Sequence, residues 1–185
     1  MRCCNCKKKN LKKILNFGKQ PVSSVFSNQK IKKFKKYSLD LYECQNCKLV
    51  QFSKLAPLNE MYGQTYGYRT SLSKLMVNHM YSKYSNIKKN KYIKRNSNIL
   101  DIGSNDGTFL NFFLKDKIKA DFFGIDPSAN KFKKFYNKKI KLITDYFSFK
   151  KISNDIDYKK TNKRFSLITS FAMFYDIEDP NLFCK

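Results

Sequence analysis

The second half of the chain alternates short apolar runs with polar, helix-like stretches. Four apolar runs predict buried strands, at Ile99–Ile102, Phe122–Asp126, Ile140–Ile143 and Phe165–Phe171. Helices are predicted between them, at Thr108–Leu114 and Ala129–Asn137. Strands that alternate with short helices are typical of a parallel sheet covered by helices. The pattern therefore predicts an α/β domain over residues 97–185.

Residues 1–55 have a different pattern, in which short extended stretches such as Tyr37–Tyr42 lie between cysteines. Five of the six cysteines of the chain fall in this region. The pattern predicts a small separate module.

Residues 56–96 connect the two regions. They contain a Tyr- and Gly-rich segment, Tyr62–Tyr68, and then a helical pattern that we expect to end before Lys88. Apolar positions three and four residues apart predict one buried helix face. The residues of this face are Leu72, Leu75, Met76, His79 and Met80.

The charge balance is strongly basic, with 38 Lys and Arg against 14 Asp and Glu, a net charge of +24. Such a charge first suggests nucleic acid or an anionic membrane. Almost all of it is lysine, however, whereas base and phosphate recognition favours the planar arginine fork. We therefore expect a solvated lysine surface that attracts anionic small molecules, and no nucleic-acid partner.

No apolar run approaches the ~20 residues that span a bilayer, and the N-terminus lacks the apolar core of a signal peptide. We expect a cytoplasmic protein without a membrane segment. In a reducing compartment the cysteines are better metal ligands or thiols than disulfides.

The run from Asp101 to Gly107 follows the first predicted strand and leads into a helix. Gly103 and Gly107 would let the backbone pass close to a ligand, and the helix start would offer N–H groups. The run resembles the cofactor loop of class I S-adenosylmethionine-dependent methyltransferases, although a structural turn or a dinucleotide site is the alternative. The resemblance implies a Rossmann-like domain, of which strands one to four are present.

The same resemblance implies the residues that contact the cofactor. Asp126, after the second strand, would accept the ribose hydroxyls. Asp145 and Tyr146 would hold adenine, and Phe171 would lie at the same rim. The full set is Asp101, Gly103, Ser104, Asn105, Gly107, Asp126, Asp145, Tyr146 and Phe171.

Two Cys-x-x-Cys pairs, Cys3/Cys6 and Cys44/Cys47, could present four thiolates to one tetrahedral Zn²⁺. A redox dithiol is the alternative, and Cys4 could replace Cys3 as a ligand. We expect a structural zinc, because such a small module lacks a large core.

The zinc module, Tyr-rich connector and Ser-Asn-Asp-Gly loop together resemble sugar C-methyltransferases that act on nucleotide-activated keto-deoxysugars. Further matching segments are Gly18-x-x-Pro21, Cys44–Gln51, Tyr66-x-Tyr68-x-x-Ser71 with His79, and Phe174–Pro180. The resemblance implies removal of a proton beside a ketone and attack of the enolate on the sulfonium methyl group.

No catalytic base is identified, and Tyr66, Tyr68 and His79 are weak candidates. We expect His79 to be buried and hydrogen-bonded in the helix face. The family's base cluster belongs to a C-terminal portion that has no match here, so we expect a truncated chain that cannot turn over alone. The competing hypotheses are a basic zinc protein or methyltransferase acting on RNA, and a scaffold without catalysis.

Overall fold

The computed structural model describes residues 1–22, 35–63, 66–93, 96–155 and 164–185. Two compact units contain them, a first unit of Met1–Gly67 with Ala172–Lys185 and a second unit of Tyr68–Phe171. The first unit thus takes in residues 172–185, which the sequence pattern groups with the α/β region. Positions 64–65 and 94–95 of the connector lie outside the described residues.

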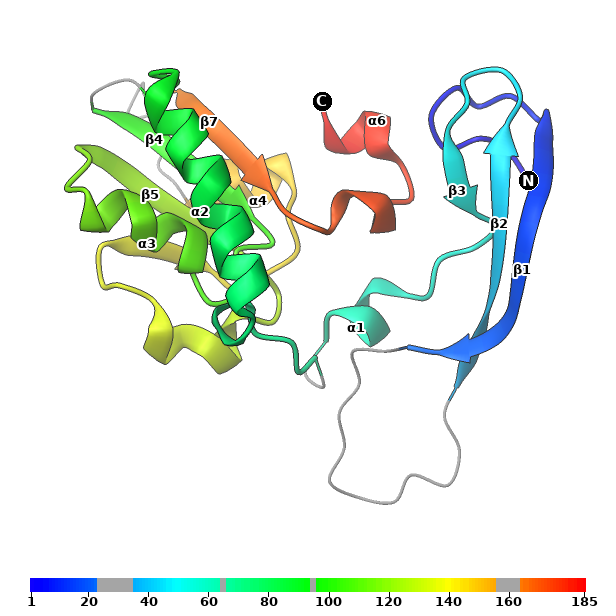
Figure 1. Cartoon of the computed structure of the whole chain (residues 1–185), viewed down its shortest axis with the longest axis horizontal. Coiled ribbons are helices and arrows are strands. Elements are labelled where there is room, and N and C mark those ends of the chain that lie inside the picture. The colour runs from blue at the N-terminus through cyan, green and yellow to red at the C-terminus, as the bar shows by residue number, and fades with distance from the viewer. Residues whose placement is uncertain (23–34, 64–65, 94–95, 156–163) are drawn as a thin grey trace. The chain divides into compact units, whose positions relative to one another are not determined.

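The first unit is built on an antiparallel sheet in the order β1-β2-β3 (Figure 1). Its strands are β1 (Leu11–Pro21), β2 (Lys36–Cys44) and β3 (Val50–Phe52). The short helices of this unit are α1 (Leu58–Met61), η3 (Phe174–Asp176) and α6 (Pro180–Phe183).

Side-chain contacts between described residues join residues 172–185 to the rest of the first unit. The Tyr62 hydroxyl donates a hydrogen bond to the Asp176 carboxylate. Asn181 Nδ2 donates to the Asn5 carbonyl at 2.7 Å. Lys7 Nζ lies 3.0 Å from Asp179 Oδ2. These contacts explain why the segment after the last strand belongs to this unit.

The second unit contains a four-stranded parallel sheet in the order β6-β5-β4-β7. Its strands are β4 (Ser97–Ile102), β5 (Ala120–Ile125), β6 (Ile140–Ile143) and β7 (Phe165–Ser170). All six residues of β4 are buried, as expected for a central strand covered on both faces. The predicted α/β class with a parallel sheet is confirmed.

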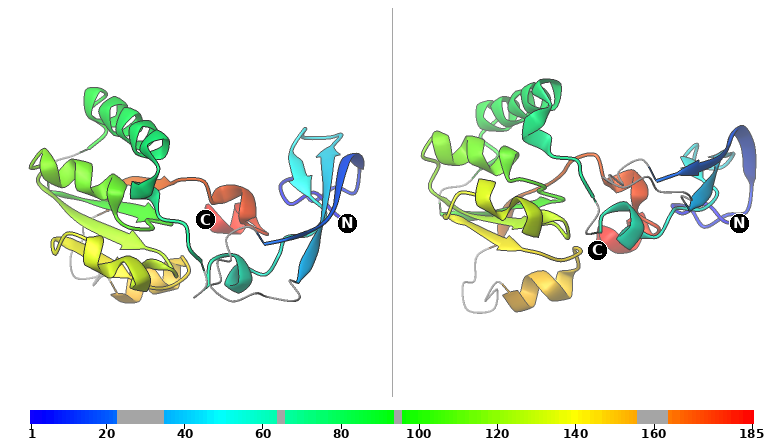
Figure 2. Two further views of the ribbon diagram at one scale, coloured as in Figure 1. Left: turned by 60° about the horizontal axis from the view of Figure 1, so that its bottom comes forward. Right: turned by 90° about the horizontal axis from the view of Figure 1, so that it is seen from below.

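Helices cover both faces of this sheet (Figure 2). Helices α2 (Lys74–Lys89) and α3 (Thr108–Lys115) pack together on one face, and α4 (Phe149–Asp155) lies on the other. The helix predicted at 129–137 is a 3₁₀ helix, η2 (Ala129–Phe135). A second one, η1 (Thr70–Leu72), precedes α2.

The predicted buried face of α2 is confirmed at Met80 and wrong at three other positions. Leu72 lies outside the helix and is 71% exposed, Leu75 is 83% exposed, and His79 is also exposed. The buried positions of the helix are Met80 and, outside the predicted face, Tyr84. Tyr84 packs on Phe113 of α3 with ring centroids 4.8 Å apart, and this aromatic contact orients the helix.

The α2 helix also continues through the lysines expected to lie beyond it. Its N-cap is Ser73, whose hydroxyl accepts the Met76 N–H, and its C-cap is Asn90. Lysines in the last turn interact favourably with the helix dipole, which explains the extra length.

Aromatic side chains fill the core between α2, α3 and the sheet. Phe109 and Phe113 of α3 are almost fully buried and contact each other edge to face at 5.3 Å. Phe122 of β5 lies 6.2 Å from Phe113. These aromatic contacts therefore pack the helices against the sheet.

Among the residues that the structure describes, no helix is both long enough and apolar enough to cross a lipid bilayer.

Candidate functional site

The two Cys-x-x-Cys turns have the same backbone geometry. In the first, Cys3 N–H donates to Lys8 O at 2.9 Å and Lys7 N–H donates to Cys3 O at 3.0 Å. The matching bonds of the second turn, from Cys44 N–H and Lys48 N–H, measure 2.8 and 2.9 Å. Lys7 and Lys48 both have left-handed backbones, with φ of 59° and 62°. Each turn therefore presents its two thiols in the same way.

The four thiols converge on one point. Their Sγ atoms all lie within 4.8 Å of one another, and the Cys3–Cys47 and Cys6–Cys44 distances are both 3.5 Å. A tetrahedral Zn²⁺ with bonds of about 2.3 Å needs sulfur atoms roughly 3.8 Å apart. The sulfur positions fit that ion and are too far apart for disulfides.

Backbone N–H groups favour the thiolate forms of Cys44 and Cys47. The Leu49 N–H is the largest influence that lowers the pKa of Cys47, to about 6. Backbone hydrogen bonds from Cys47 and Asn46 likewise lower the pKa of Cys44. Thiolate is the form that binds zinc.

Cys4 is not part of the cluster, so the structure gives no role to the alternative ligand. Its N–H donates to Gln51 Oε1 at 2.9 Å, and Gln51 Nε2 donates to Arg2 O at 3.4 Å. Gln51 thus joins the second turn's strand to the first turn. Cys184 is an exposed thiol.

Asp101 lies at the carboxyl end of β4, fully enclosed by protein. Thr169 Oγ1 donates to its Oδ1 at 2.8 Å. Burial, together with the nearby charge of Asp126, raises the pKa of Asp101 to about 7. Gly103, with a φ of 73°, follows in a left-handed turn and donates its N–H to Ile125 O at 2.8 Å.

Asp126 lies at the end of the neighbouring strand β5 and is 7% exposed. Its Oδ1 accepts the N–H and hydroxyl of Ser128 at 2.7 and 2.6 Å. Its Oδ2 accepts the N–H of Asn105 at 2.9 Å. The carboxylate is therefore tied to the loop that leaves β4.

The Asn105 and Asp106 side chains contact protein backbone. Asn105 Nδ2 donates to Tyr68 O at 3.1 Å, and Asn105 Oδ1 accepts Thr70 N–H at 2.9 Å. Asp106 Oδ2 accepts Ser71 N–H at 3.0 Å. The Ser-Asn-Asp insert thus fastens the connector to the loop.

The start of α3 offers less to an anionic ligand than the sequence suggests. Asp106 Oδ1 accepts the N–H and the hydroxyl of Thr108, at 3.2 and 2.6 Å. This carboxylate occupies the first donor of the helix and places a negative charge beside it. A positively charged ligand group suits this position better.

Sequence reasoning missed Tyr136, which lies beneath the loop. Its hydroxyl is 2.8 Å from Ser104 Oγ and donates to Asn105 O at 2.8 Å. A Cβ atom at Gly107 would come within 2.9 Å of the ring, and one at Gly124 within 2.7 Å of Ser104 Oγ. Both glycines are thus required by close packing below the loop.

Arg69 was also missed. Its guanidinium stacks 4.0 Å above the Phe135 ring, and its Nε lies 4.0 Å from Asp106 Oδ2. These two contacts fix the side chain between the connector and the loop. Neither Arg69 nor Tyr136 belongs to a recognisable sequence motif, because single arginines and tyrosines are common in any sequence.

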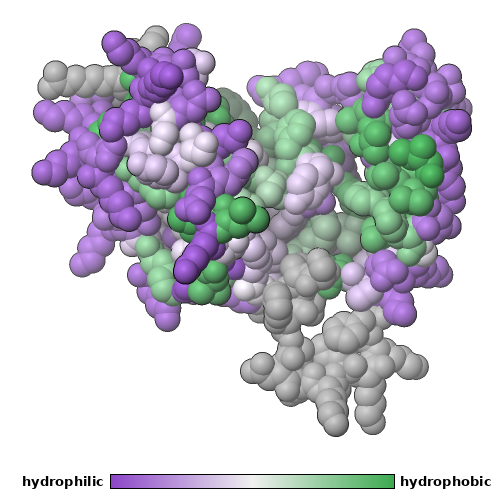
Figure 3. Space-filling model, in the orientation of Figure 1, coloured by the Kyte–Doolittle hydropathy of each residue, from purple (hydrophilic) through white to green (hydrophobic). Residues whose placement is uncertain are grey.

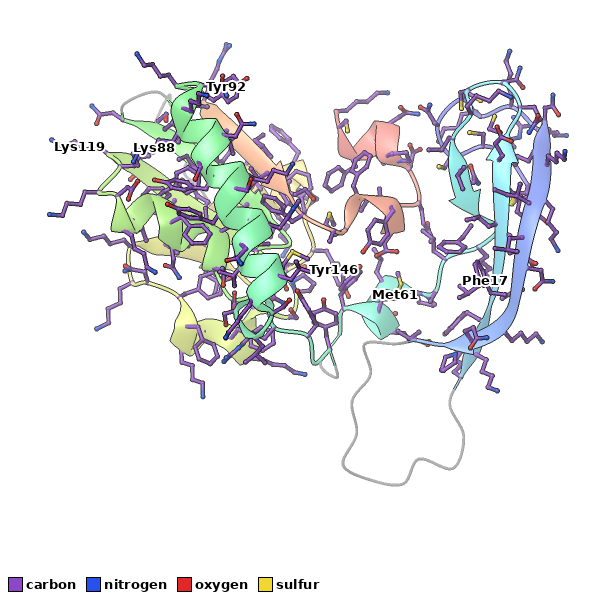
Figure 4. All side chains as sticks on the ribbon, in the orientation of Figure 1. Phe17, Met61, Lys88, Tyr92, Lys119 and Tyr146 are labelled. Atoms are coloured by element: carbon purple, nitrogen blue, oxygen red, sulfur yellow. The ribbon has the colours of Figure 1, made fainter. Side chains whose placement is uncertain are left out.

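Asp145 and Tyr146 are joined by a hydrogen bond of 2.7 Å from the Tyr146 N–H, whereas Phe171 packs in the core. Asp145 is paired with Lys151 at 2.6 Å, and hydrogen bonding to Lys151 lowers its pKa. Tyr146 follows the carboxyl end of β6 (Figure 4), and burial and Asp126 raise its pKa. Phe171 packs on Phe109 at 4.6 Å.

The candidate bases differ in their surroundings. Tyr66 lies in the first unit, 5.3 Å from the Tyr62 ring. Tyr68 lies in the second unit with 38% of its surface exposed. His79 is exposed on α2, so the buried, hydrogen-bonded role expected for it is wrong.

The site is acidic within a strongly basic protein. Asp101, Asp106 and Asp126 are 2%, 2% and 7% exposed, whereas the chain carries +24 overall. Among the described residues, these three buried acids have one nearby cation, Arg69 at 4.0 Å from Asp106, and they therefore favour a cationic ligand. S-adenosylmethionine, with a sulfonium and an ammonium group, fits this chemistry.

Comparisons with known families agree with both halves of this description. Residues 3–62 match the family model of a zinc binding domain. Residues 77–183 match a model described as a methyltransferase domain, which covers more than half of the chain. No curated protein matches the chain.

The parallel sheet, the acidic loop at its carboxyl edge and the four converging thiols agree with these matches. The cofactors are S-adenosylmethionine and Zn²⁺. The chain belongs to this methyltransferase domain family and is an S-adenosylmethionine-dependent methyltransferase that carries a zinc-binding module.

Proposed function

We propose that the enzyme methylates a carbon atom beside the ketone of a nucleotide-linked deoxysugar. The observation that carries this proposal is the contact between Tyr68–Ser71 and Asn105–Asp106. These segments are two separate parts of the sequence resemblance to sugar C-methyltransferases. Their direct hydrogen bonding supports treating them as one functional element.

Asp101 and Asp126 would hold the cofactor at the carboxyl edge of the sheet. Asp126 Oδ2 would accept a ribose hydroxyl, and the carboxylate charges would attract the sulfonium and ammonium groups. The backbone from Gly103 to Gly107 would border the methionine part, and Tyr146 would border adenine. When bound, the cofactor supplies an electrophilic methyl group.

The reaction balances as a proton removal followed by methyl transfer. A base takes the proton from the carbon beside the ketone, and the electron pair forms an enolate. The enolate carbon then forms a bond to the methyl carbon, and the sulfur keeps the electrons of the broken bond. S-adenosylhomocysteine and the C-methylated sugar are the products.

The charge distribution supports an anionic acceptor. The exterior is rich in lysine, and this field attracts a nucleoside diphosphate group without requiring base recognition. The buried acids would bind the cationic cofactor, whereas the surface lysines would attract the anionic acceptor.

The zinc would hold the first unit together through Cys3, Cys6, Cys44 and Cys47. With four protein ligands it has no open position for a substrate or for water. We infer a structural role for the metal.

Because the resemblance places the base cluster in a C-terminal portion without a match here, the test joins the chain to that portion of a sugar C-methyltransferase. S-adenosylmethionine and a nucleoside-diphosphate-linked 4-keto-6-deoxyhexose are then added. We expect the sugar to gain 14 mass units, the mass of one CH₂ group, with the new methyl group on carbon by NMR. The sugar carbon next to the ketone should also exchange its proton with deuterated solvent. Methyl transfer to RNA, or to a sugar hydroxyl, would contradict the proposal.

A further inference from the structure

The connector segment Tyr68–Ser71 is fixed to the cofactor loop through its backbone. Tyr68 supplies a carbonyl, and Thr70 and Ser71 supply N–H groups. All three groups bond to side chains of the loop, at Asn105 or Asp106. Side chains of two loop residues therefore hold the backbone of this segment in place.

Asn105 uses all its polar groups within the protein. Its N–H donates to Asp126, its carbonyl accepts the Tyr136 hydroxyl, and its carboxamide binds Tyr68 and Thr70. The residue is 6% exposed and has a left-handed φ of 50°, which asparagine tolerates better than most residues. Both polar atoms of its side chain thus bind the connector.

The chemistry of the segment specifies a carboxamide. Tyr68 and Thr70 present one carbonyl and one N–H, two residues apart, as the edge of an extended strand does. A carboxamide carries an acceptor oxygen and a donor NH₂ group, so it matches both groups. A carboxylate would place two acceptors there and would repel the Tyr68 carbonyl.

The same residue contacts the acid that would hold the ribose. Asn105 N–H donates to Asp126 Oδ2 at 2.9 Å. A carboxylate offers about four acceptor positions, and Ser128 and Asn105 use three of those of Asp126. A ribose hydroxyl would bind the oxygen that Asn105 already contacts, so ligand binding and the position of Asn105 are linked.

We propose that Asn105 is a positioning residue that couples cofactor binding at Asp126 to the ordering of Tyr68–Ser71. This inference rests on Asp126 belonging to the cofactor site, and it is independent of the acceptor. Coupling free energies are reciprocal. The cofactor therefore stabilises the segment, and the segment strengthens cofactor binding by the same factor.

Asn105→Gly is the direct test. Glycine keeps the left-handed backbone and its bonds to Asp126 and Tyr136, and it removes only the carboxamide. Hydrogen exchange at the Thr70 and Ser71 amides is measured with and without S-adenosylhomocysteine, and calorimetry gives the affinity. In the wild type we expect the ligand to slow exchange at both amides. In Asn105→Gly we expect this ligand-dependent change to disappear at Thr70 and the affinity to fall about tenfold.

Asn96→Gly is the matched control, because Asn96 is an exposed asparagine with a similar φ of 58°. It should leave both the exchange response and the affinity unchanged. If Asn105→Gly only destabilised the protein, amide exchange at Thr70 and Ser71 would change equally with and without the ligand. The ligand-dependent difference therefore separates coupling from destabilisation.

Thr70→Pro tests the same bond from its other side. Proline removes the Thr70 N–H, and the first position of a helix after extended Arg69 (φ −130°, ψ 122°) accepts proline. If the bond carries the coupling, Asn105→Gly should weaken binding less in this background than in the wild type. Wild-type affinity in Asn105→Gly, or equal losses in both backgrounds, would overturn the inference.

The experiment contains no acceptor, so its outcome does not depend on the sugar. Failure of sugar methylation with intact coupling would reject only the proposed function. If sugar methylation is intact but Asn105→Gly keeps the wild-type affinity and exchange response, only the role of Asn105 is rejected.

Discussion

The two units of the molecule differ in what stabilises the fold of each. In the first unit, the buried residues among those described are Cys3 and Cys44. Strand β1 leaves Ile14, Leu15 and Phe17 about half exposed, and apolar residues gather on the visible face of this sheet (Figures 3 and 4). The second unit buries a continuous aromatic core. A sheet without a core needs a metal, whereas a sheet between helices does not.

The largest effect should therefore come from removing the metal. Structural zinc contributes roughly 10–16 kcal/mol of binding free energy in small zinc modules. We expect a strong chelator, or Cys44→Ser, to unfold β1, β2 and β3 while β4 and β5 stay protected. Hydrogen exchange of the two sheets measures this directly.

Cys184→Ser is the matched control, because Cys184 is an exposed thiol outside the cluster. It should leave both sheets protected. Retention of protection in β2 after complete loss of zinc would contradict the comparison between the units.

The core of the second unit is tested by a pair of leucines on its helices. Leu110 of α3 is fully buried, whereas Leu75 of α2 is 83% exposed. We expect Leu110→Ala to lower the free energy of unfolding by about 2–5 kcal/mol. Leu75→Ala should change it by less than about 0.5 kcal/mol. Urea unfolding followed by circular dichroism measures both, and equal effects would refute the assigned core.

A smaller, pH-dependent effect is expected from Asp101. Burial raises its pKa to about 7 from an ordinary value of 3.8. The folded state then binds the proton more tightly between about pH 4 and 7, so stability falls as the pH rises through that range. Three pKa units correspond to about 4 kcal/mol at most. Asp101→Asn should remove this slope in urea unfolding measured from pH 5 to 8.

Asp116→Asn serves as the control of opposite sign. The Lys88 ammonium group, followed by the Tyr84 hydroxyl, lowers the pKa of Asp116 through hydrogen bonds. Its stabilisation is present at neutral pH and is lost as the pH falls toward its folded pKa. A wild-type slope in Asp101→Asn would show that the Asp101 carboxyl is not protonated in the folded protein.

The smallest effect concerns the contact of α6 with the first zinc turn. Lys7 and Asp179 are both about half exposed, and exposed ion pairs contribute about 0–1 kcal/mol. We expect Lys7→Ala to reduce the protection of the Leu182 amide only slightly. A loss of protection throughout the first unit would mean that the pair has a larger structural role.

The sheet could be predicted from the sequence because its strands are buried on both faces. A run such as Ile99–Ile102 is apolar at almost every position, and it ends at a turn that needs glycine. The zinc cluster was equally predictable, since two Cys-x-x-Cys pairs leave few alternatives.

The face of α2 could not be predicted, because two apolar stripes overlap along that helix. Leu72, Leu75 and His79 form one stripe, and Met76, Met80 and Tyr84 form the other. Only the position of Phe113 decides between them. Long-range contacts of this kind are invisible to local periodicity.

The contacts of the loop side chains also could not be predicted from the sequence. The motif suggested that Asn105 faces the cofactor, whereas its side chain binds Tyr68 and Thr70. Spacing locates a loop but does not distinguish side chains that bind a ligand from those that bind the protein itself.

The equivalence of the two zinc turns has a consequence for how the first unit assembles. Each turn closes its own hydrogen bonds within six residues, at 3–8 and 44–49, and so requires no contact with distant parts of the chain. Either turn can therefore form first and capture the metal through two thiolates. The captured ion then raises the effective concentration of the second pair. Zinc would thus take part in folding as well as stabilise its product, whichever turn forms first.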